Sequence, residues 1–221
     1  MKNIDLLYQY RFNEKENKVK YRIWQILCES YFQRFIPESS TVMDLAAGYG
    51  EFIKNIKAKE KIAIDINPNS KAVLSDDIRF HSLDATDLYE IESGSIDIVF
   101  VSNFFEHLKT KMELDKVFVE INRVLKPEGK LLVMQPNIRY CYNQYWDFYD
   151  HYTPLSHFSA IEGLKKSGFT VEKVIPKFLP FSTKSFFPKN SFLIRAYLMF
   201  PIFWPLFGKQ FFIVARKSAF K

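Results

Sequence analysis

The chain has 221 residues, of which 48% are hydrophobic and 25% are charged, and its formal net charge is +6. This composition is ordinary for a globular protein, and the length suits one α/β core better than two. No stretch of about 20 apolar residues is present to span a bilayer, and the start lacks the apolar core of a secretory signal. We therefore expect a cytoplasmic protein. Cys28 and Cys141 lie outside any cysteine or histidine cluster, which argues against a disulfide framework or a zinc site.

The positive charge is concentrated at the end of the chain. Glu172 is the last acidic residue, and nine basic residues follow it. A basic, aromatic C-terminal quarter favours a phosphate-bearing or membrane-associated partner. A solvated face that only aids solubility is the alternative.

An amphipathic helix is predicted over residues 21–35, because apolar residues recur three and four positions apart and Pro37 follows. We expect residues 1–38 to form an N-terminal helical cap and residues 39–221 to form the main domain. From residue 41 onward, strand-like and helix-like runs alternate. This alternation predicts an α/β fold with a doubly wound, Rossmann-like sheet and helices on both of its faces.

The seven expected strands cover residues 41–45, 61–66, 78–81, 96–102, 130–134, 170–175 and 210–215. The expected helices begin near residue 51 and cover about 70–74, 114–125 and 159–167. An apolar, basic insertion at 176–209 separates the last two strands. Its most apolar part, 191–207, is short and contains Pro201 and Pro205, so it does not suit a spanning helix. A lid over the substrate, a homodimer surface, or peripheral contact with the inner face of a membrane remain open for this segment.

The stretch "VMDLAAGYGEF" places a strand, an acid and a glycine turn before a helix start. Such a corner brings the backbone close to a nucleotide. A dinucleotide fingerprint needs a third glycine, and Ile53 stands in its place. Asp44 directly before the turn would repel a phosphate and suits a ligand with positive charge. Gly48 and Gly50 are expected to form the turn, and Glu51 to be a surface or capping residue.

Three further strand ends carry polar residues. Asp65 ends the second strand, next to Ile66, where a carboxylate can accept both ribose hydroxyls. Asp84 can accept from an adenine amino group beside the Ala85 backbone, or it can simply cap a turn. Ser102 and Asn103 end the fourth strand.

This succession resembles the class I S-adenosylmethionine-dependent methyltransferases. The resemblance rests on the turn, the acids that end the strands, the segment "SIDIVFVSNFFEHL" and the turn "VLKPEGKLLV", and it covers residues 41–135 well. Ala46 stands where the family commonly has its first glycine. The resemblance implies a mostly parallel sheet with an antiparallel last strand, and S-adenosylmethionine as the cofactor. It implies that the cofactor-binding residues are Asp44, Ala46, Gly48, Gly50, Asp65, Ile66, Asp84, Ala85, Ser102 and Asn103.

Candidates for a catalytic base are His107 in "FFEHL" and Asp150 with His151 in "YWDFYDHYTPLSHFS". A hydroxyl acceptor needs such a base, whereas a carboxylate acceptor does not. A structural His151 bonded to Asp150 is the alternative. His157 is expected at a helix N-terminus and His81 at a strand end. The acids and histidines are not at metal-ligand spacing, so no metal site is expected.

The first functional hypothesis is a small-molecule O-methyltransferase that acts on a glycan or a lipid-linked sugar. The sequence is similar to bacterial methyltransferases of surface-polysaccharide synthesis. An RNA methyltransferase and a non-enzymatic S-adenosylmethionine-binding protein are the alternatives. No nucleic-acid partner is expected, because the segment that would carry a base-flipping motif reads "SNFF".

Overall fold

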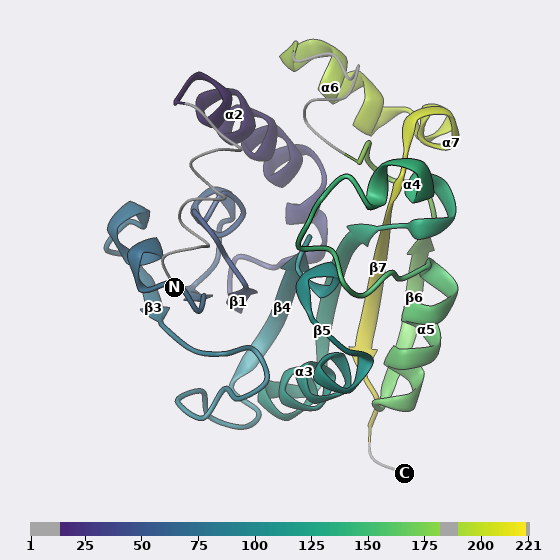
Figure 1. The fold of residues 1–221 in the computed structure, drawn as a ribbon. Coiled ribbons are helices and arrows are strands. Elements are labelled where there is room, and N and C mark those ends of the chain that lie inside the picture. The colour runs from purple at the N-terminus through teal and green to yellow at the C-terminus, as the bar shows by residue number, and fades with distance from the viewer. Residues whose placement is uncertain (1–13, 182–189, 220–221) are drawn as a thin grey trace.

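The computed structural model describes residues 14–181 and 190–219. Its centre is a seven-stranded sheet in the order β3-β2-β1-β4-β5-β7-β6 (Figure 1). The strands are β1 (Thr41–Leu45), β2 (Glu60–Ile64), β3 (Ile78–His81), β4 (Ile96–Ser102), β5 (Leu125–Pro136), β6 (Phe169–Ile175) and β7 (Gln210–Lys217).

The pairing of the strands confirms the predicted sheet. β1 pairs in parallel with β2 and β4, and the pairs β2/β3 and β4/β5 are also parallel. β7 lies antiparallel between β5 and β6. The carboxyl ends of the parallel strands therefore meet at one edge, where open α/β sheets place their ligands.

The α-helices are α2 (Glu14–Ser30), α3 (Lys111–Val124), α4 (Ile138–Tyr145), α5 (His157–Lys166), α6 (Ser191–Met199) and α7 (Trp204–Phe207). Five 3₁₀ helices complete the described elements: η1 (Phe32–Phe35), η2 (Ile53–Asn55), η3 (Pro68–Val73), η4 (Phe105–His107) and η5 (Pro201–Phe203).

Several expected helices differ from the structure. The helix expected from residue 51 is only the single turn η2, and the one expected near residue 70 is the 3₁₀ helix η3. Pro68 stands in the first turn of η3, and the side chain of Asn67 accepts from the Asn69 backbone before it. α4 was not predicted, because it has only eight residues and buries only two of them, Cys141 and Tyr145, which is too short a pattern to stand out in the sequence.

The two faces of the sheet are covered by different helices. α3 and α5 bury the apolar stripe that was predicted over 114–125, together with one face of the sheet. The other face is covered by η1, the end of α2, α6 and α7, with a core in which aromatic rings are interspersed among aliphatic side chains. In that core the rings of Phe52 and Phe100 stack with their centroids 3.6 Å apart.

α2 and α6 lie together beyond the edge where the parallel strands end (Figure 1). Arg195 of α6 donates to Glu29 and Ser30 at the end of α2, at 2.8 and 2.7 Å. The predicted helix over 21–35 corresponds to α2 followed by η1, and α2 begins earlier than expected. The first part of the predicted cap, residues 1–13, and residues 182–189 of the insertion lie outside the described residues.

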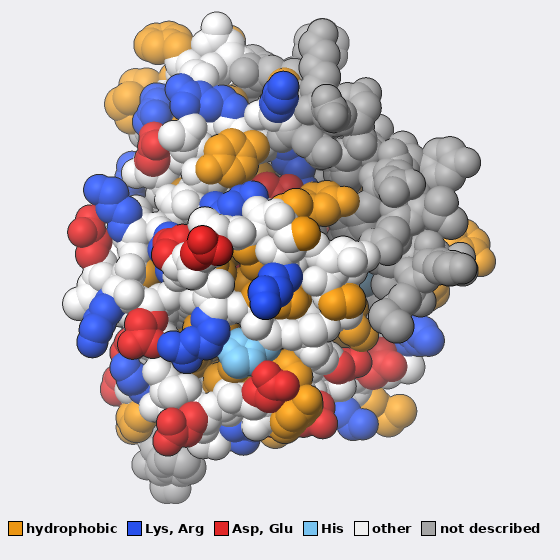
Figure 2. Space-filling view, turned by 90° about the vertical axis from the view of Figure 1, so that its left-hand side faces the viewer, with side chains coloured by type: hydrophobic (Ala, Val, Ile, Leu, Met, Phe, Trp, Pro, Cys, Tyr) orange, Lys and Arg blue, Asp and Glu red, His pale blue; other side chains and the backbone are white. Residues whose placement is uncertain are grey.

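Within the described residues, no helix combines the length and apolar character needed to cross a bilayer. Figure 2 shows a side of the molecule on which basic and acidic side chains are intermixed, with small apolar groups between them. On this side, the described residues therefore form no continuous stripe of one charge.

Candidate active site

The turn after β1 is held in a backbone conformation that favours glycine. Ala46, Gly48 and Gly50 have φ angles of 59°, 55° and 71°. The Gly48 N–H donates to Oδ2 of Asp65 at 2.7 Å, and the Asn67 N–H donates to Oδ1 of the same carboxylate at 2.9 Å. Asp65 therefore connects the end of β2 to the turn. Burial raises the pKa of Asp65, while these two hydrogen bonds oppose the shift.

The two glycines of the turn have different surroundings. A Cβ at Gly48 would meet no protein atom within 4 Å, whereas a Cβ at Gly50 would lie 2.3 Å from Cδ2 of Leu74. A side chain at Gly50 would therefore have to displace the Leu74 side chain, and the φ of 71° at Gly50 also favours glycine. Gly48 instead leaves an open space above the turn that a ligand can fill.

Asp44 lies beneath the turn and is 4% exposed. Burial raises the pKa of its carboxyl group well above the usual range, and the charge of Glu51 adds to the shift. A hydrogen bond from the Ile53 backbone opposes it. Because this residue does not line the cavity described next, its predicted contact with the positive end of the ligand stays a prediction.

A cavity of about 320 Å³ opens beside the turn. Six residues singled out from the sequence line it: Ala46, Gly48, Ser102, Asn103, His107 and His151. Its other walls come from α2, β5, α6, the loop after α4 and the segment around residue 180. Tyr49, Trp24, Phe148 and Phe181 are aromatic residues of the lining. The cavity thus joins the turn to the predicted catalytic residues.

The remaining predicted cofactor residues lie outside this lining. Ile66 is largely exposed and Ala85 is buried. Oδ1 of Asp84 accepts from the backbone N–H and the hydroxyl of Thr86, both at 2.8 Å. The turn-capping interpretation of Asp84 is therefore confirmed, and its contact with adenine remains a prediction.

Glu51 has a place that the sequence did not indicate. It lines the cavity, and its carboxylate lies 2.7 Å from Nζ of Lys20, which projects from α2. Glu51 is therefore not a simple surface residue. No pattern in the sequence predicts this contact, because Lys20 belongs to α2, which is distant from the turn along the chain.

The segment after α4 is attached to the loop after β4. The carbonyl of Glu106 accepts from the N–H groups of Tyr152 and Thr153, at 2.7 and 3.2 Å. The Thr153 hydroxyl donates to the Leu108 carbonyl, and the Tyr145 hydroxyl donates to the Thr153 carbonyl. These bonds bring His151 over η4.

His107 is oriented by Asp150. Its Nδ1 lies 2.9 Å from the Asp150 carbonyl oxygen and 3.2 Å from Oδ2 of the Asp150 carboxylate. Burial lowers the pKa of His107, but the carboxylates of Asp150 and Glu106 outweigh it, so the pKa lies above its ordinary value. With Nδ1 donating to Asp150, Nε2 is the nitrogen that can accept a proton.

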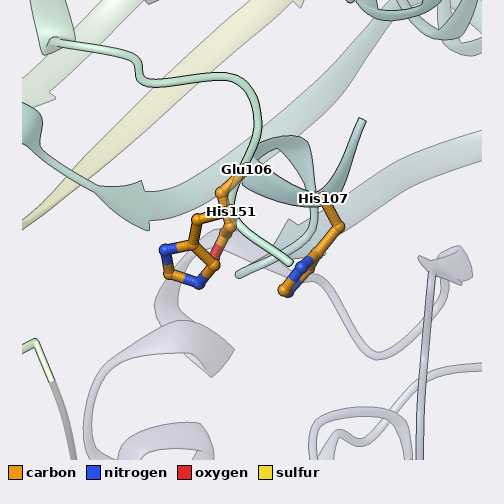
Figure 3. A group of neighbouring side chains, drawn as sticks. All are labelled: Glu106, His107 and His151. Carbon is orange, nitrogen blue, oxygen red and sulfur yellow. The ribbon is translucent and has the colours of Figure 1, made fainter. Parts of the chain in front are cut away.

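Glu106, His107 and His151 converge in Figure 3, and one ligand-type atom from each lies within 4.8 Å of the other two. The sequence spacing had led us to expect no such grouping. It arises because the loop after α4 returns to η4. Aromatic rings pack against His151. The ring of Phe148 stacks on the imidazole with the centroids 4.8 Å apart, and the centroid of the Tyr145 ring lies 4.7 Å from that of His151.

Glu106 was present in the quoted motif but was not singled out. It is 4% exposed, lines the cavity, and burial raises its pKa to about 7. Among the described residues, its Oε2 is a buried atom without a hydrogen-bond partner. A buried carboxylate oxygen in this state is suited to a ligand.

The two other histidines lie apart from this group. Nδ1 of His81, at the end of β3, lies 2.5 Å from the Glu90 carboxylate. His157 is the first residue of α5, as predicted, and its Nδ1 lies 2.9 Å from Nδ2 of Asn137. We assign both to local structure.

Comparison with known proteins gives the class of the site. Residues 43–133 match the family model described as a methyltransferase domain. This match implies S-adenosylmethionine as the cofactor. Among curated proteins, the Bacillus subtilis (strain 168) protein named "Putative methyltransferase YqeM" is 29% identical over 110 residues. That alignment covers 46% of this chain and 44% of YqeM, so the chain matches less than half the length of this relative.

The fold is shared with solved structures. A chain from the complex between the Haloferax volcanii Trm112 methyltransferase activator and a methyltransferase has a TM-score of 0.68 and 19% identity, with 94% of this chain and 95% of that chain covered. A SAM-dependent methyltransferase from Archaeoglobus fulgidus has a TM-score of 0.63 and 21% identity, with 87% and 94% covered. At these identities the similarity extends to the fold alone.

The residues present fit the cofactor. Next to Gly48 the turn leaves a space that a Cβ would fill. The carboxylate of Asp65 accepts from the Gly48 N–H and so fixes the backbone beside this space. Ser102 and Asn103 face the same cavity from the end of β4, where Asn103 has a φ of 46°.

Proposed function

We propose that the chain transfers a methyl group from S-adenosylmethionine to a hydroxyl of a small-molecule acceptor, namely a glycan or a lipid-linked sugar. The observation that carries the proposal is that the glycine turn and His107 line the same cavity. Asp150 lies outside this lining and holds Nδ1 of His107 at 3.2 Å. Bound S-adenosylmethionine supplies a methyl group activated by a sulfonium. The protein then has to align an acceptor with that group and remove the acceptor proton.

In the proposed reaction, the turn residues and Asp65 hold the cofactor, and the polar end of the cavity holds the acceptor. Nε2 of His107 accepts the proton of the hydroxyl, while Asp150 keeps Nδ1 protonated and stabilises the imidazolium that forms. His151 faces the same space and positions the acceptor. Walls from α2 and α6 limit the access of water.

The lining of the cavity supports a polyhydroxylated acceptor. Oε2 of Glu106 and Oε1 of Gln210 are buried atoms that find no hydrogen-bond partner within residues 14–181 and 190–219. Sugar hydroxyls can satisfy both. Trp24, Phe148 and Phe181 add the aromatic surfaces on which sugar rings or an isoprenoid can pack.

An RNA substrate is the alternative. Methyltransferases with this fold include one solved with the Trm112 activator, but the identity of 19% carries only the fold. On the side shown in Figure 2, the basic and acidic side chains of the described residues are intermixed, so this side does not offer the basic stripe that a nucleic-acid backbone requires.

We further propose that the enzyme contacts an anionic membrane surface through an apolar patch on α6, η5 and α7. Eight large apolar side chains of this patch are 43–77% exposed: Phe192, Leu193, Met199, Phe200, Ile202, Phe203, Leu206 and Phe207. Basic residues flank it. Arg195 lies on α6, and Nζ of Lys177 donates to the Pro205 carbonyl. An apolar surface with basic flanks suits the interface of a bilayer that contains anionic lipids.

The function is tested by incubating the protein with S-adenosylmethionine and cell-envelope glycan or lipid-linked sugar fractions. Mass spectrometry should detect a methyl increment in one acceptor, and this product should be lost in the His107→Gln variant. A methylated RNA with no methylated glycan would overturn the assignment of the acceptor class.

A further inference from the structure

We propose that Glu106, His107 and His151 form a binding site for a divalent transition-metal ion of the zinc or ferrous type. Two imidazoles and one carboxylate are a ligand set that such ions use in proteins, with further positions left open. The three side chains come from η4 and from the loop after α4, and they meet at the wall of the cavity (Figure 3).

The distances are close to those that an ion requires. One ligand-type atom of each residue lies within 4.8 Å of the others. Two bonds of about 2.1 Å can bridge at most about 4.2 Å, so small rotations of the side chains must bring the atoms together when an ion binds. Glu106 and His107 are adjacent in η4, which leaves His151 as the residue that closes the site.

Two further observations point to a ligand. Oε2 of Glu106 is buried at the cavity wall, and no hydrogen-bond partner for it exists in the described part of the chain. His107 is oriented as metal-binding histidines usually are. Its Nδ1 is held by the carboxylate and the carbonyl of Asp150, which leaves Nε2 with its lone pair.

The inference concerns binding, and it stands whether or not the proposed function is correct. An ion bound here would occupy Nε2 of His107, so the role of His107 as base under the proposed function would apply to the ion-free protein. In the ion-loaded protein the ion would instead supply Lewis-acid activation of the acceptor hydroxyl, whose proton would pass to water.

The test uses the full chain after chelator treatment and gel filtration. Titration with Co²⁺ should give visible ligand-field absorption that saturates at one ion per chain, and Zn²⁺ should abolish it by competition. His151→Ala and Glu106→Gln should each weaken Co²⁺ binding at least tenfold. Asp150→Asn should weaken it about 10- to 100-fold, as expected for a partner that orients a ligand.

His81→Ala is the matched control, because it removes an imidazole that lies outside the cavity and should leave the titration unchanged. Circular dichroism melts establish that each variant is folded. Calorimetry with S-adenosylmethionine on the same samples tests the cofactor site separately. Absence of saturable binding in the unaltered protein, or equal binding in the Glu106 and His151 variants, would overturn the metal site.

Discussion

Oδ2 of Asp150 lies 3.2 Å from Nδ1 of His107, a residue on a different loop at the end of β4. This contact joins two segments that are distant in the sequence and orients His107, the residue that we propose as the base. His151 lines the same cavity, where we propose that it positions the acceptor.

Replacement of Asp150 by asparagine tests the His107–Asp150 pair. The carboxylate helps to raise the pKa of His107, so its removal lowers that pKa and the enzyme should become active at lower pH. Because the imidazolium is no longer stabilised, kcat should fall about 10- to 100-fold. A pH–rate profile measures both effects. An unchanged profile would remove His107 from the role of base.

His151→Ala should slow turnover while the dissociation constant of S-adenosylmethionine stays the same. The reason is that His151 packs against Phe148 and Tyr145, whereas the turn is attached to Asp65, and His151 takes no part in that attachment. Single-turnover kinetics and calorimetry separate the two quantities. A matching loss of cofactor affinity would show that His151 supports the cofactor site instead.

The two glycines should respond differently to alanine. Gly48→Ala places a methyl group in the open space above the turn, so the cofactor should bind at least tenfold more weakly. The free energy of unfolding should fall by only roughly 1 kcal/mol, because alanine is strained in the left-handed conformation. Gly50→Ala adds a clash with Leu74, and the free energy of unfolding should fall by about 1–3 kcal/mol more. Urea unfolding and cofactor titration measure these effects. The opposite ranking would contradict the assignment of Gly48 to the ligand.

Glu106→Gln should stabilise the metal-free protein at high pH. The pKa of Glu106 is raised to about 7 in the folded state, from an ordinary value of 4.5, so ionisation above that range destabilises the folded state. The glutamine variant avoids this cost. In the presence of chelator, the free energy of unfolding of the variant should exceed that of the unaltered protein by about 3 kcal/mol at about pH 8 and by under about 1 kcal/mol at about pH 5. Equal stability at both values would show that Glu106 is solvated.

The apolar patch can be tested with vesicles. Ile202→Asp combined with Leu206→Asp should reduce co-sedimentation with phosphatidylglycerol vesicles at least fivefold, since both side chains are more than 70% exposed. Val119→Asp is the control, because this exposed residue lies on α3, away from the patch. Light scattering would reveal a dimer through the patch, and a dimer with no vesicle binding would contradict the membrane contact.

The strands and the glycine turn could be predicted from local patterns, and the mostly parallel sheet with its antiparallel last strand from the family resemblance. Alternating runs predict the strands, and Gly48 and Gly50 of the predicted turn have the positive φ angles that glycine adopts readily. The cavity walls could not be predicted in this way. Lys20 and Trp24 reach the site from α2, and His151 reaches η4 through bonds between Glu106 and residues 152–153. Such contacts depend on packing between distant segments, which no short-range pattern records.

Asp65 carries the central claim, because it links the turn to the predicted ribose position. Calorimetric titration of the protein with S-adenosylmethionine tests this claim most directly. We predict saturable binding of one molecule per chain, weakened by more than about 1 kcal/mol in Asp65→Ala and unchanged in Asp77→Ala, a surface acid paired with Lys61. No heat of binding at concentrations well above micromolar, or equal affinity in the two variants, would contradict it.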